Sequence, residues 1–265
     1  MRLKDKTAII TGGSRGLGKA IAKAYLNEGA VVIITARNQE RLQATAEELC
    51  PLGRIEGISM DVSQFTAVQE TMGSIIDKYG RVDILVNNAG IPSGPKGSGA
   101  MLYRQQPGTT TSGALLIDMT EEQFDSVIAV NLKGVFACAK AVAGHMIQRG
   151  CGRIINISSV TAHRGSFGQT NYAASKAGII SMTQTWAKEL GRKGVTVNAV
   201  APGYTATEMI GSAPGEVIGT VREKTPVKRL GTPEEMAAAC VYIASDQAGF
   251  VNGAVLNIDG GIVLS

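Results

Sequence analysis

Thr11-Gly12-Gly13-Ser14-Arg15-Gly16-Leu17-Gly18 carries the strongest structural signal in this chain. The stretch stands directly between a short apolar run and a helical pattern. In that setting Gly12 permits a sharp turn, Gly16 lets the backbone approach a phosphate, and Gly18 allows the helix to pack closely. A glycine cluster alone can be a simple turn, but this placement predicts a pyrophosphate site at the positive end of a helix dipole.

Short runs rich in β-branched residues alternate with amphipathic helical stretches on both sides of this turn. The predicted strands are Lys6–Thr11, Val31–Thr35, Ile55–Met60, Ile84–Val86, Arg153–Ile157, Val195–Val200 and Ala254–Ile258. The predicted helices are Leu17–Asn27, Asn38–Leu49 with Asn38 as the cap, Thr66–Lys78, Thr120–Arg149, Tyr172–Gly191 and Pro233–Ser245. This alternation is typical of a parallel sheet covered by helices on both faces. We therefore expect a single α/β domain over residues 1–265, a doubly wound parallel sheet (Rossmann fold).

The composition of the chain argues against several classes of binding partner, namely nucleic acids, metal ions and membranes. The chain has 265 residues, of which 44% are hydrophobic and 18% charged, as expected for one globular domain. Aromatic content of 5% and a scattered net charge of +4 argue against a nucleic-acid partner. Two histidines and four widely spaced cysteines predict no metal site. Without a signal peptide or an apolar stretch of roughly 18 to 20 residues, we expect no membrane partner and a cytoplasmic location.

Further motifs follow the glycine turn in a fixed order. Asn87-Asn88-Ala89-Gly90 comes after the fourth predicted strand, and Asn131 lies in a helical stretch. Ser159 ends the fifth strand, Tyr172-Ala173-Ala174-Ser175-Lys176 follows, and Pro202-Gly203 comes after the sixth strand. With the T-G-x-x-x-G-x-G spacing of the turn, this order resembles the short-chain dehydrogenase/reductase family over almost the whole chain. The resemblance implies a nicotinamide dinucleotide as cofactor.

The resemblance also implies a set of cofactor-binding residues spread over six segments. They are Gly12, Ser14, Arg15, Gly16, Leu17 and Gly18 in the turn, Arg37 after the second strand, Asp61 and Val62 at the adenine, Asn88, Ala89 and Gly90 along the central portion, Tyr172 and Lys176 at the nicotinamide ribose, and Pro202, Gly203, Thr205 and Thr207 after the sixth strand.

The choice between NADP(H) and NAD(H) can be argued from charge. An acidic residue after the second strand would accept a hydrogen bond from the ribose 2′-hydroxyl of NAD and repel a 2′-phosphate. This strand ends Thr35-Ala36-Arg37-Asn38, without an acid. Arg37 and Arg15 are two guanidinium groups that could reach one phosphate, which favours NADP(H). The alternative is that Arg37 is a solvated residue at the start of the next helix.

Tyr172 and Lys176 are four residues apart and therefore share one face of a helix. A phenol with a pKa near 10 is a poor base at neutral pH, but a neighbouring ammonium would lower that pKa and permit acid/base catalysis. By resemblance, Ser159 would polarise a carbonyl oxygen, whereas Ser158 should point elsewhere. Asn131 would support a water on a proton path to Lys176. The alternative for Asn131 is a side chain that merely bonds backbone.

These residues predict an NADP(H)-dependent oxidoreductase (EC 1.1.1.-) that transfers a hydride between the nicotinamide and a carbonyl or secondary alcohol. The runs Gln169–Gly178, Val197–Gly203, Arg229–Gly231 and Asp259–Gly261 most resemble those of 3-oxoacyl-[acyl-carrier-protein] reductases. An acyl-thioester carbonyl is therefore the expected substrate and a homotetramer the expected assembly. Because these motifs serve cofactor and scaffold, a sugar, polyol or other small-alcohol dehydrogenase remains an alternative, as does a non-catalytic NADP-binding protein.

Two segments lack periodicity, an extended loop over Ile91–Asp118 and an expected substrate loop over Tyr204–Gly231. The first is either a flap that touches substrate through Met101, Leu102 and Tyr103, or a plain surface insertion. Arg149, Arg192 and Lys193 are candidate contacts for an acidic carrier protein at the entrance of the site. Gly150 departs from the basic residue that carrier reductases tend to have there.

Overall fold

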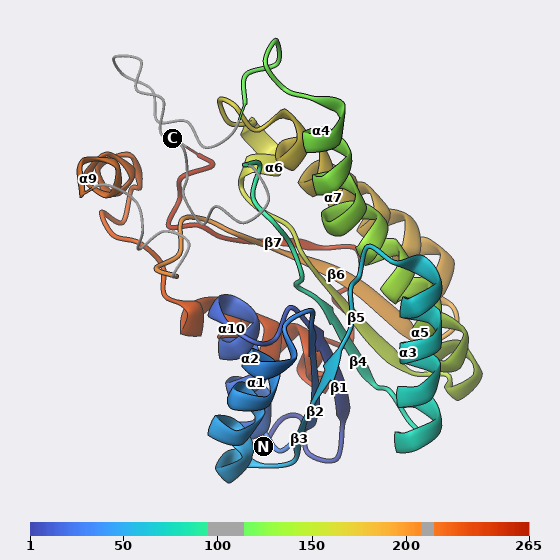
Figure 1. The fold of residues 1–265 in the computed structure, drawn as a ribbon. Coiled ribbons are helices and arrows are strands. Elements are labelled where there is room, and N and C mark those ends of the chain that lie inside the picture. The colour runs from blue at the N-terminus through green and yellow to red at the C-terminus, as the bar shows by residue number, and fades with distance from the viewer. Residues whose placement is uncertain (95–113, 208–214, 265) are drawn as a thin grey trace.

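A sheet of seven parallel strands forms the centre of the molecule. The computed structural model describes residues 1–94, 114–207 and 215–264. The strands are β1 (Thr7–Thr11), β2 (Val31–Ala36), β3 (Ile55–Ser59), β4 (Ile84–Asn87), β5 (Gly152–Ile157), β6 (Val195–Pro202) and β7 (Val255–Ile258). Their spatial order is β3-β2-β1-β4-β5-β6-β7 (Figure 1). Successive strands are added outward on one side of β1 up to β3 and then, from β4, on its other side. This reversal of strand order confirms the doubly wound fold, and in such folds it creates a crevice for ligands at the carboxyl ends of β1 and β4.

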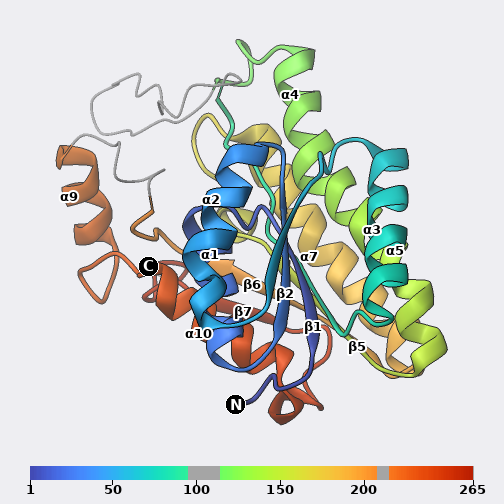
Figure 2. The ribbon, with the colours of Figure 1, turned by 60° about the horizontal axis from the view of Figure 1, so that its bottom comes forward.

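Helices cover both faces of the sheet (Figures 1 and 2). One face carries α1 (Gly16–Asn27), α2 (Gln39–Leu49) and α10 (Pro233–Ala244), and the other carries α3 (Phe65–Tyr79), α5 (Gly134–Arg149) and α7 (Thr170–Gly191). Neighbouring strand residues point to opposite faces, so Ile10 and Ile34 pack with the first group and Ile9 and Ile33 with the second. The shorter helices are α4 (Glu121–Ile128), α6 (Thr161–Arg164), α9 (Gly215–Lys224), and the 3-10 turns η1 (Cys50–Leu52) and η3 (Asp246–Ala248).

The helix predicted over Thr120–Arg149 is confirmed as a continuous helical run from Glu121 to Arg149, with one π turn inside it. Thr120 caps α4, with its side chain accepting from the backbone N–H of Gln123. A π turn, η2 (Ala129–Lys133), then separates α4 from α5 and contains Asn131. Such turns frequently occur at functional sites. The sequence did not predict this π turn, because it leaves the apolar pattern on either side intact. Likewise, α9 lies inside the segment 204–231, which was expected to be irregular.

The run Glu121–Arg149 also corrects the expectation that no apolar stretch is long enough to cross a membrane. By length and composition it meets that criterion. Its apolar residues, however, are used inside the fold, where Cys138, Val142 and Met146 are buried against α3 and the sheet. The run is therefore explained as a core helix.

Two predicted features lie outside the described residues. Residues 95–113 contain Met101, Leu102 and Tyr103, so the flap and the surface insertion both stay predictions. Residues 208–214 belong to the expected substrate loop, of which Tyr204–Thr207 and the part from Gly215 onward are described.

Candidate active site

The glycine turn after β1 has the geometry that a phosphate site requires. Gly12 and Gly16 have φ angles of +67° and +51°, in the left-handed region that favours glycine. A Cβ on Gly16 would meet nothing within 4 Å, so the space in front of helix α1 is open there. Among the described residues, no side chain caps this helix, which begins after Arg15. The free N–H groups of its first turn therefore fit the phosphates of a dinucleotide.

Gly18 holds the turn against the loop that follows β4. A Cβ at this position would lie 2.3 Å from the carbonyl oxygen of Gly12 and 2.5 Å from Nδ2 of Asn88. We expect Gly18→Ala to lower the free energy of unfolding by about 2 kcal/mol, as over-packing does. Gly73→Ala in α3 is the matched control, because its Cβ would meet nothing within 4 Å; it should stabilise by about 0.5–1 kcal/mol. Urea unfolding measures both, and equal effects would contradict this packing.

Asn88 joins the two loops at the centre of the crevice. Its Nδ2 donates to the carbonyl oxygens of Thr11 at 2.9 Å and Gly12 at 3.2 Å. The hydroxyl of Thr11 in turn accepts from the backbone N–H groups of Asn88 and Ala89, each at 3.0 Å. The predicted motif Asn88–Gly90 therefore lies against the glycine turn. Asn88 acts here as a structural tie, and cofactor contact by this motif stays a prediction.

The candidate residues for the adenosine end lie at the carboxyl ends of β1, β2 and β3. Arg15 in the turn and Arg37 directly after β2 are both exposed. Asp61 follows β3, and its Oδ1 accepts from the backbone N–H of Ser63 at 2.9 Å and from the Ser63 hydroxyl at 2.7 Å. Val62 is buried, and contact with it leaves no room for a Cβ on Gly134.

The candidates after β6 form a second loop at the same edge of the sheet. Pro202 ends β6, and a Cβ on Gly203 would lie 2.7 Å from Cα of Asp259. Thr205 pairs with Gly231 in an isolated parallel bridge, and its hydroxyl donates to the carbonyl of Gly203 at 3.2 Å. The backbone N–H of Thr207 donates to the carbonyl of Thr205 at 2.8 Å.

Tyr172, Lys176 and Ser159 meet where β5 ends and α7 begins. Nζ of Lys176 lies 5.6 Å from the centre of the Tyr172 ring. Ser159 hydrogen-bonds the Tyr172 side chain. The hydroxyl of Ser158 instead donates to the backbone carbonyl of Lys176 at 2.8 Å, so the backbone of α7 and not the phenol of Tyr172 is its partner. The structure thus brings together the hydroxyl, the phenol and the amine that the sequence predicted.

The pKa of Tyr172 in the structure differs from the value expected from its spacing to Lys176. Burial raises the pKa of Tyr172 above its ordinary value, and the hydrogen bond from Ser159 only partly offsets this. Lys176 was expected to lower that pKa, but its ammonium donates to the carbonyl of Ile157 at 2.8 Å. Burial lowers the pKa of Lys176 itself to about 8. The amine is therefore poised to exchange a proton near neutral pH.

This burial predicts a pH-dependent cost in stability. The pKa of Lys176 is about 8 in the folded protein, against about 10.4 in an unfolded chain. The penalty is fully present below pH 8 and disappears as the pH rises to about 10.4. We expect Lys176→Met to raise the free energy of unfolding at pH 7 by about 2 kcal/mol, after subtraction of the lost bond to Ile157. Urea unfolding at pH 7 and pH 10 measures this, and a difference independent of pH would contradict it.

Asn131 is fully buried in the π turn η2. Its Oδ1 accepts from the backbone N–H of Ile91 at 2.8 Å, and its Nδ2 donates to the carbonyl of Ile91 at 2.9 Å. A Cβ on Gly90 would lie 3.3 Å from Oδ1 of Asn131 and 3.7 Å from Nζ of Lys176, so both polar groups border the same backbone. The side chain thus makes the backbone contacts of the alternative interpretation, while a water-supporting role stays a prediction.

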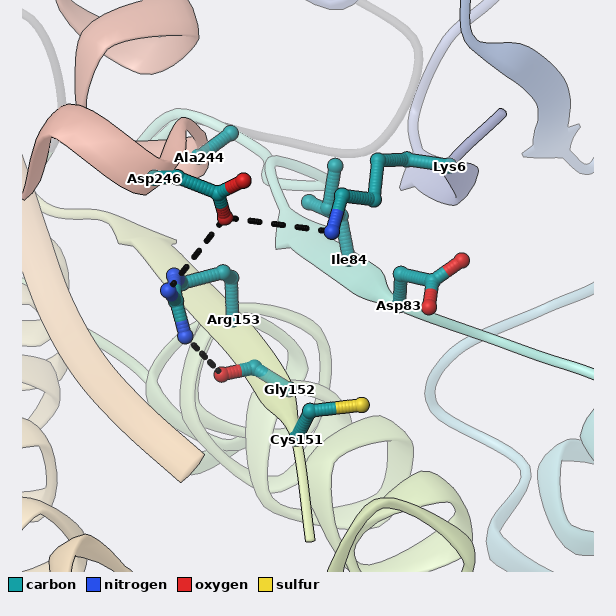
Figure 3. A pocket seen from close by; sticks show the side chains of 8 residues that line it. All are labelled: Lys6, Asp83, Ile84, Cys151, Gly152, Arg153, Ala244 and Asp246. Carbon is teal, nitrogen blue, oxygen red and sulfur yellow. Dashed lines mark hydrogen bonds and ion pairs between the residues drawn. The ribbon is translucent and has the colours of Figure 1, made fainter. Parts of the chain in front are cut away.

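A cavity of about 60 Å³ lies at the opposite edge of the sheet (Figure 3). Its lining includes Lys6, Asp83 and Arg153, from the amino ends of β1, β4 and β5. Asp246 lies 3.8 Å from both Nζ of Lys6 and Nη2 of Arg153. Because Tyr172 stands beyond the carboxyl ends of the strands, this cavity contains none of the predicted catalytic residues.

The basic residues considered for a carrier protein lie at that same opposite edge. Arg149 ends α5 just before β5, and its Nη1 donates to Asp83 at 3.1 Å. Arg192 and Lys193 follow α7 just before β6. Residues that precede a strand of a parallel sheet lie at its amino end, so the expectation that these three flank the substrate entrance was wrong.

Two buried polar residues next to Tyr172 escaped the sequence analysis. Ser93 and Asn171 are 2% and 0% exposed and hydrogen-bond one another at 2.6 Å. In the sequence, only the position of Asn171 directly before Tyr172 pointed to a role for this pair. Nothing in the sequence links Ser93 to it, because Ser93 lies 78 positions before Asn171.

Comparison with known proteins adds evidence independent of this geometry. A family model described as enoyl-(acyl carrier protein) reductase matches residues 12–263. The chain is 42% identical to the 3-oxoacyl-[acyl-carrier-protein] reductase FabG of Thermotoga maritima, covering 100% of both. It is 38% identical to the (2S)-[(R)-hydroxy(phenyl)methyl]succinyl-CoA dehydrogenase subunit BbsD of Thauera aromatica, covering 98% of both. The solved 3-oxoacyl-[acyl-carrier protein] reductase of Brucella melitensis superposes with a TM-score of 0.88 at 34% identity, covering 100% of this chain and 93% of that one.

Proposed function

Because this chain belongs to the short-chain dehydrogenase/reductase family of oxidoreductases, we propose that it uses NADP(H) to interconvert a carbonyl and a secondary alcohol. The observation that carries the proposal is the meeting of Ser159, Tyr172 and Lys176 at the end of β5. A hydroxyl bonded to a phenol, with a buried amine 5.6 Å from the phenol ring, is a proton-transfer assembly.

Each of these side chains has one task in the proposed reaction. The bound nicotinamide supplies or accepts the hydride. Ser159 donates a hydrogen bond to the carbonyl oxygen and polarises it. Tyr172 delivers its proton to that oxygen as the alkoxide forms. Lys176, with a water supported by Asn131, returns a proton to Tyr172.

The cofactor would lie along the carboxyl edge of the sheet. The turn at residues 12–18 would bind its pyrophosphate, with Asp61 and Val62 at the adenine and Asn88 to Gly90 along its middle. Tyr172 and Lys176 would hold the nicotinamide ribose, close to Pro202, Gly203, Thr205 and Thr207. Arg15 and Arg37 are exposed where a 2′-phosphate would lie, which supports NADP(H) over NAD(H).

For the substrate we propose a 3-oxoacyl thioester, reduced at its keto group. The support is similarity to relatives named as 3-oxoacyl-[acyl-carrier-protein] reductases. The test follows the disappearance of NADPH absorbance with acetoacetyl thioesters of coenzyme A and of acyl carrier protein, against sugars, diketones and steroids. We expect the thioesters to have the highest kcat/KM. Preference for a sugar or polyol would favour the alternative within the family, and NADPH binding without turnover would favour a non-catalytic NADP-binding protein.

We further propose that the protein works as a homotetramer in the cytoplasm. Both the assembly and the location are expectations from the family resemblance of the sequence. Light scattering of the purified protein should give four times the 27.6 kDa chain mass. A monomeric mass would contradict this assembly.

A further inference from the structure

A single buried carboxamide connects three elements at the start of α7. Ser93, in the segment after β4, donates its hydroxyl proton to Oδ1 of Asn171 at 2.6 Å. Nδ2 of Asn171 donates to the carbonyl of Gln123 in α4 at 2.9 Å. The backbone N–H of Tyr172 donates to the same Oδ1 at 2.8 Å. Asn171 itself is 0% exposed.

The orientation of this amide follows from its neighbours. A backbone N–H can only donate, so the atom that it contacts must be the oxygen of Asn171. The nitrogen then faces a carbonyl, which can only accept. The oxygen and the nitrogen of the carboxamide are therefore both hydrogen-bonded in this orientation. The flipped orientation would place the amide nitrogen against the N–H of Tyr172 and the amide oxygen against the carbonyl of Gln123, so neither contact would be a hydrogen bond.

Tyr172 consequently has both of its backbone polar groups held by side chains. Its N–H is bound by Asn171, and its carbonyl accepts from the hydroxyl of Ser175 at 2.7 Å. Helix α7 has no side-chain cap at Gln169, so Asn171 takes the place of a cap in this first turn. Ser93 fixes Asn171 in turn, and its hydroxyl also lies 3.1 Å from the carbonyl of Gly168.

We propose that Asn171, held by Ser93, is the positioning residue for Tyr172 and couples it to the segment after β4. The inference rests on the proposed function, in which Tyr172 must meet the substrate oxygen at hydrogen-bond distance. Misplacement of a reacting group by about 1 Å can cost about 10²-fold in rate, although the displaced residue itself is unchanged. Asn171 touches neither substrate nor cofactor in this scheme and acts through the backbone of Tyr172.

The test compares Asn171→Ala and Ser93→Ala with a matched control, Asn198→Ala. Asn198 is also buried, donates to the carbonyl of Val251 at 2.8 Å and accepts from the N–H of Ala254 at 3.0 Å, but it lies in β6 and ties this strand to the segment before β7. Three quantities are measured on the full chain. They are kcat with acetoacetyl-coenzyme A, the Kd of NADPH by fluorescence, and the carbon-13 resonance of the Tyr172 ring carbon bearing the hydroxyl, assigned with Tyr172→Phe.

We expect Asn171→Ala to lower kcat about 30-fold and Ser93→Ala about fivefold, with the Kd of NADPH unchanged within about twofold. The Tyr172 resonance should shift in both variants, since its bond to Ser159 is disturbed. Asn198→Ala should lower stability but leave kcat and the resonance unchanged. Wild-type kcat and resonance in Ser93→Ala would overturn the proposal, even if Asn171→Ala fails to fold. The Tyr172 resonance tests the positioning role without any turnover. A wild-type protein that is inactive would therefore overturn the proposed function but not the positioning role.

Discussion

Tyr172→Phe is expected to lower kcat/KM for carbonyl reduction by about 10³-fold, within the range that loss of a general acid produces. The variant keeps the ring, whose centre lies 5.6 Å from Nζ of Lys176, and removes the hydroxyl that Ser159 bonds. The Kd of NADPH should change by less than about threefold, because most of the proposed cofactor contacts lie elsewhere. Initial rates and fluorescence titration measure the two quantities.

Tyr25→Phe is the control for this substitution. The hydroxyl of Tyr25 is fully buried and donates to the carbonyl of Cys240 at 3.1 Å, in the core beneath α10. Its loss should lower the free energy of unfolding by about 1 kcal/mol without affecting turnover. If Tyr172→Phe retained a tenth or more of wild-type activity, the phenol would not be the proton donor.

Removal of both Arg15 and Arg37 should weaken NADPH binding by about 10²- to 10⁴-fold, since each charged hydrogen bond to a phosphate contributes about 1.5–3 kcal/mol. NADH lacks the 2′-phosphate, so its Kd should change by less than about fivefold. The two arginines are exposed at the ends of the β1 turn and of β2. Their replacement by Ala should therefore change cofactor preference with little effect on folding. Fluorescence titration with both cofactors gives the ratio.

A control must remove the same charge from another place. Arg54 and Arg192 are exposed just before β3 and β6, at the amino edge of the sheet. Arg54→Ala with Arg192→Ala lowers net charge equally but should change NADPH affinity by less than about twofold at moderate salt. A similar loss in both double variants would mean that general charge, and not a 2′-phosphate contact, sets the affinity.

The fold and most of the candidate site were predictable from local patterns. Every strand contains β-branched residues, and the turn at Gly12 to Gly18 uses backbone conformations open to glycine. The four-residue spacing of Tyr172 and Lys176 places them on one helix face. The π turn at Asn131 was missed because no change of periodicity accompanies it. The expected effect of Lys176 on the pKa of Tyr172 was wrong because a short spacing does not reveal which acceptor the amine reaches.

What the chain encodes locally is the order of its elements, the glycine turn and the residues that share a face. These follow from short-range sterics and hydrophobic period, which act between near neighbours. Packing of distant segments decides the rest. It brings Ser93 to Asn171 across 78 positions, turns Lys176 toward Ile157, and lowers the pKa of that amine by burial. Burial and long-range contacts depend on how the whole sheet and its helices enclose a group, and no local pattern carries that information.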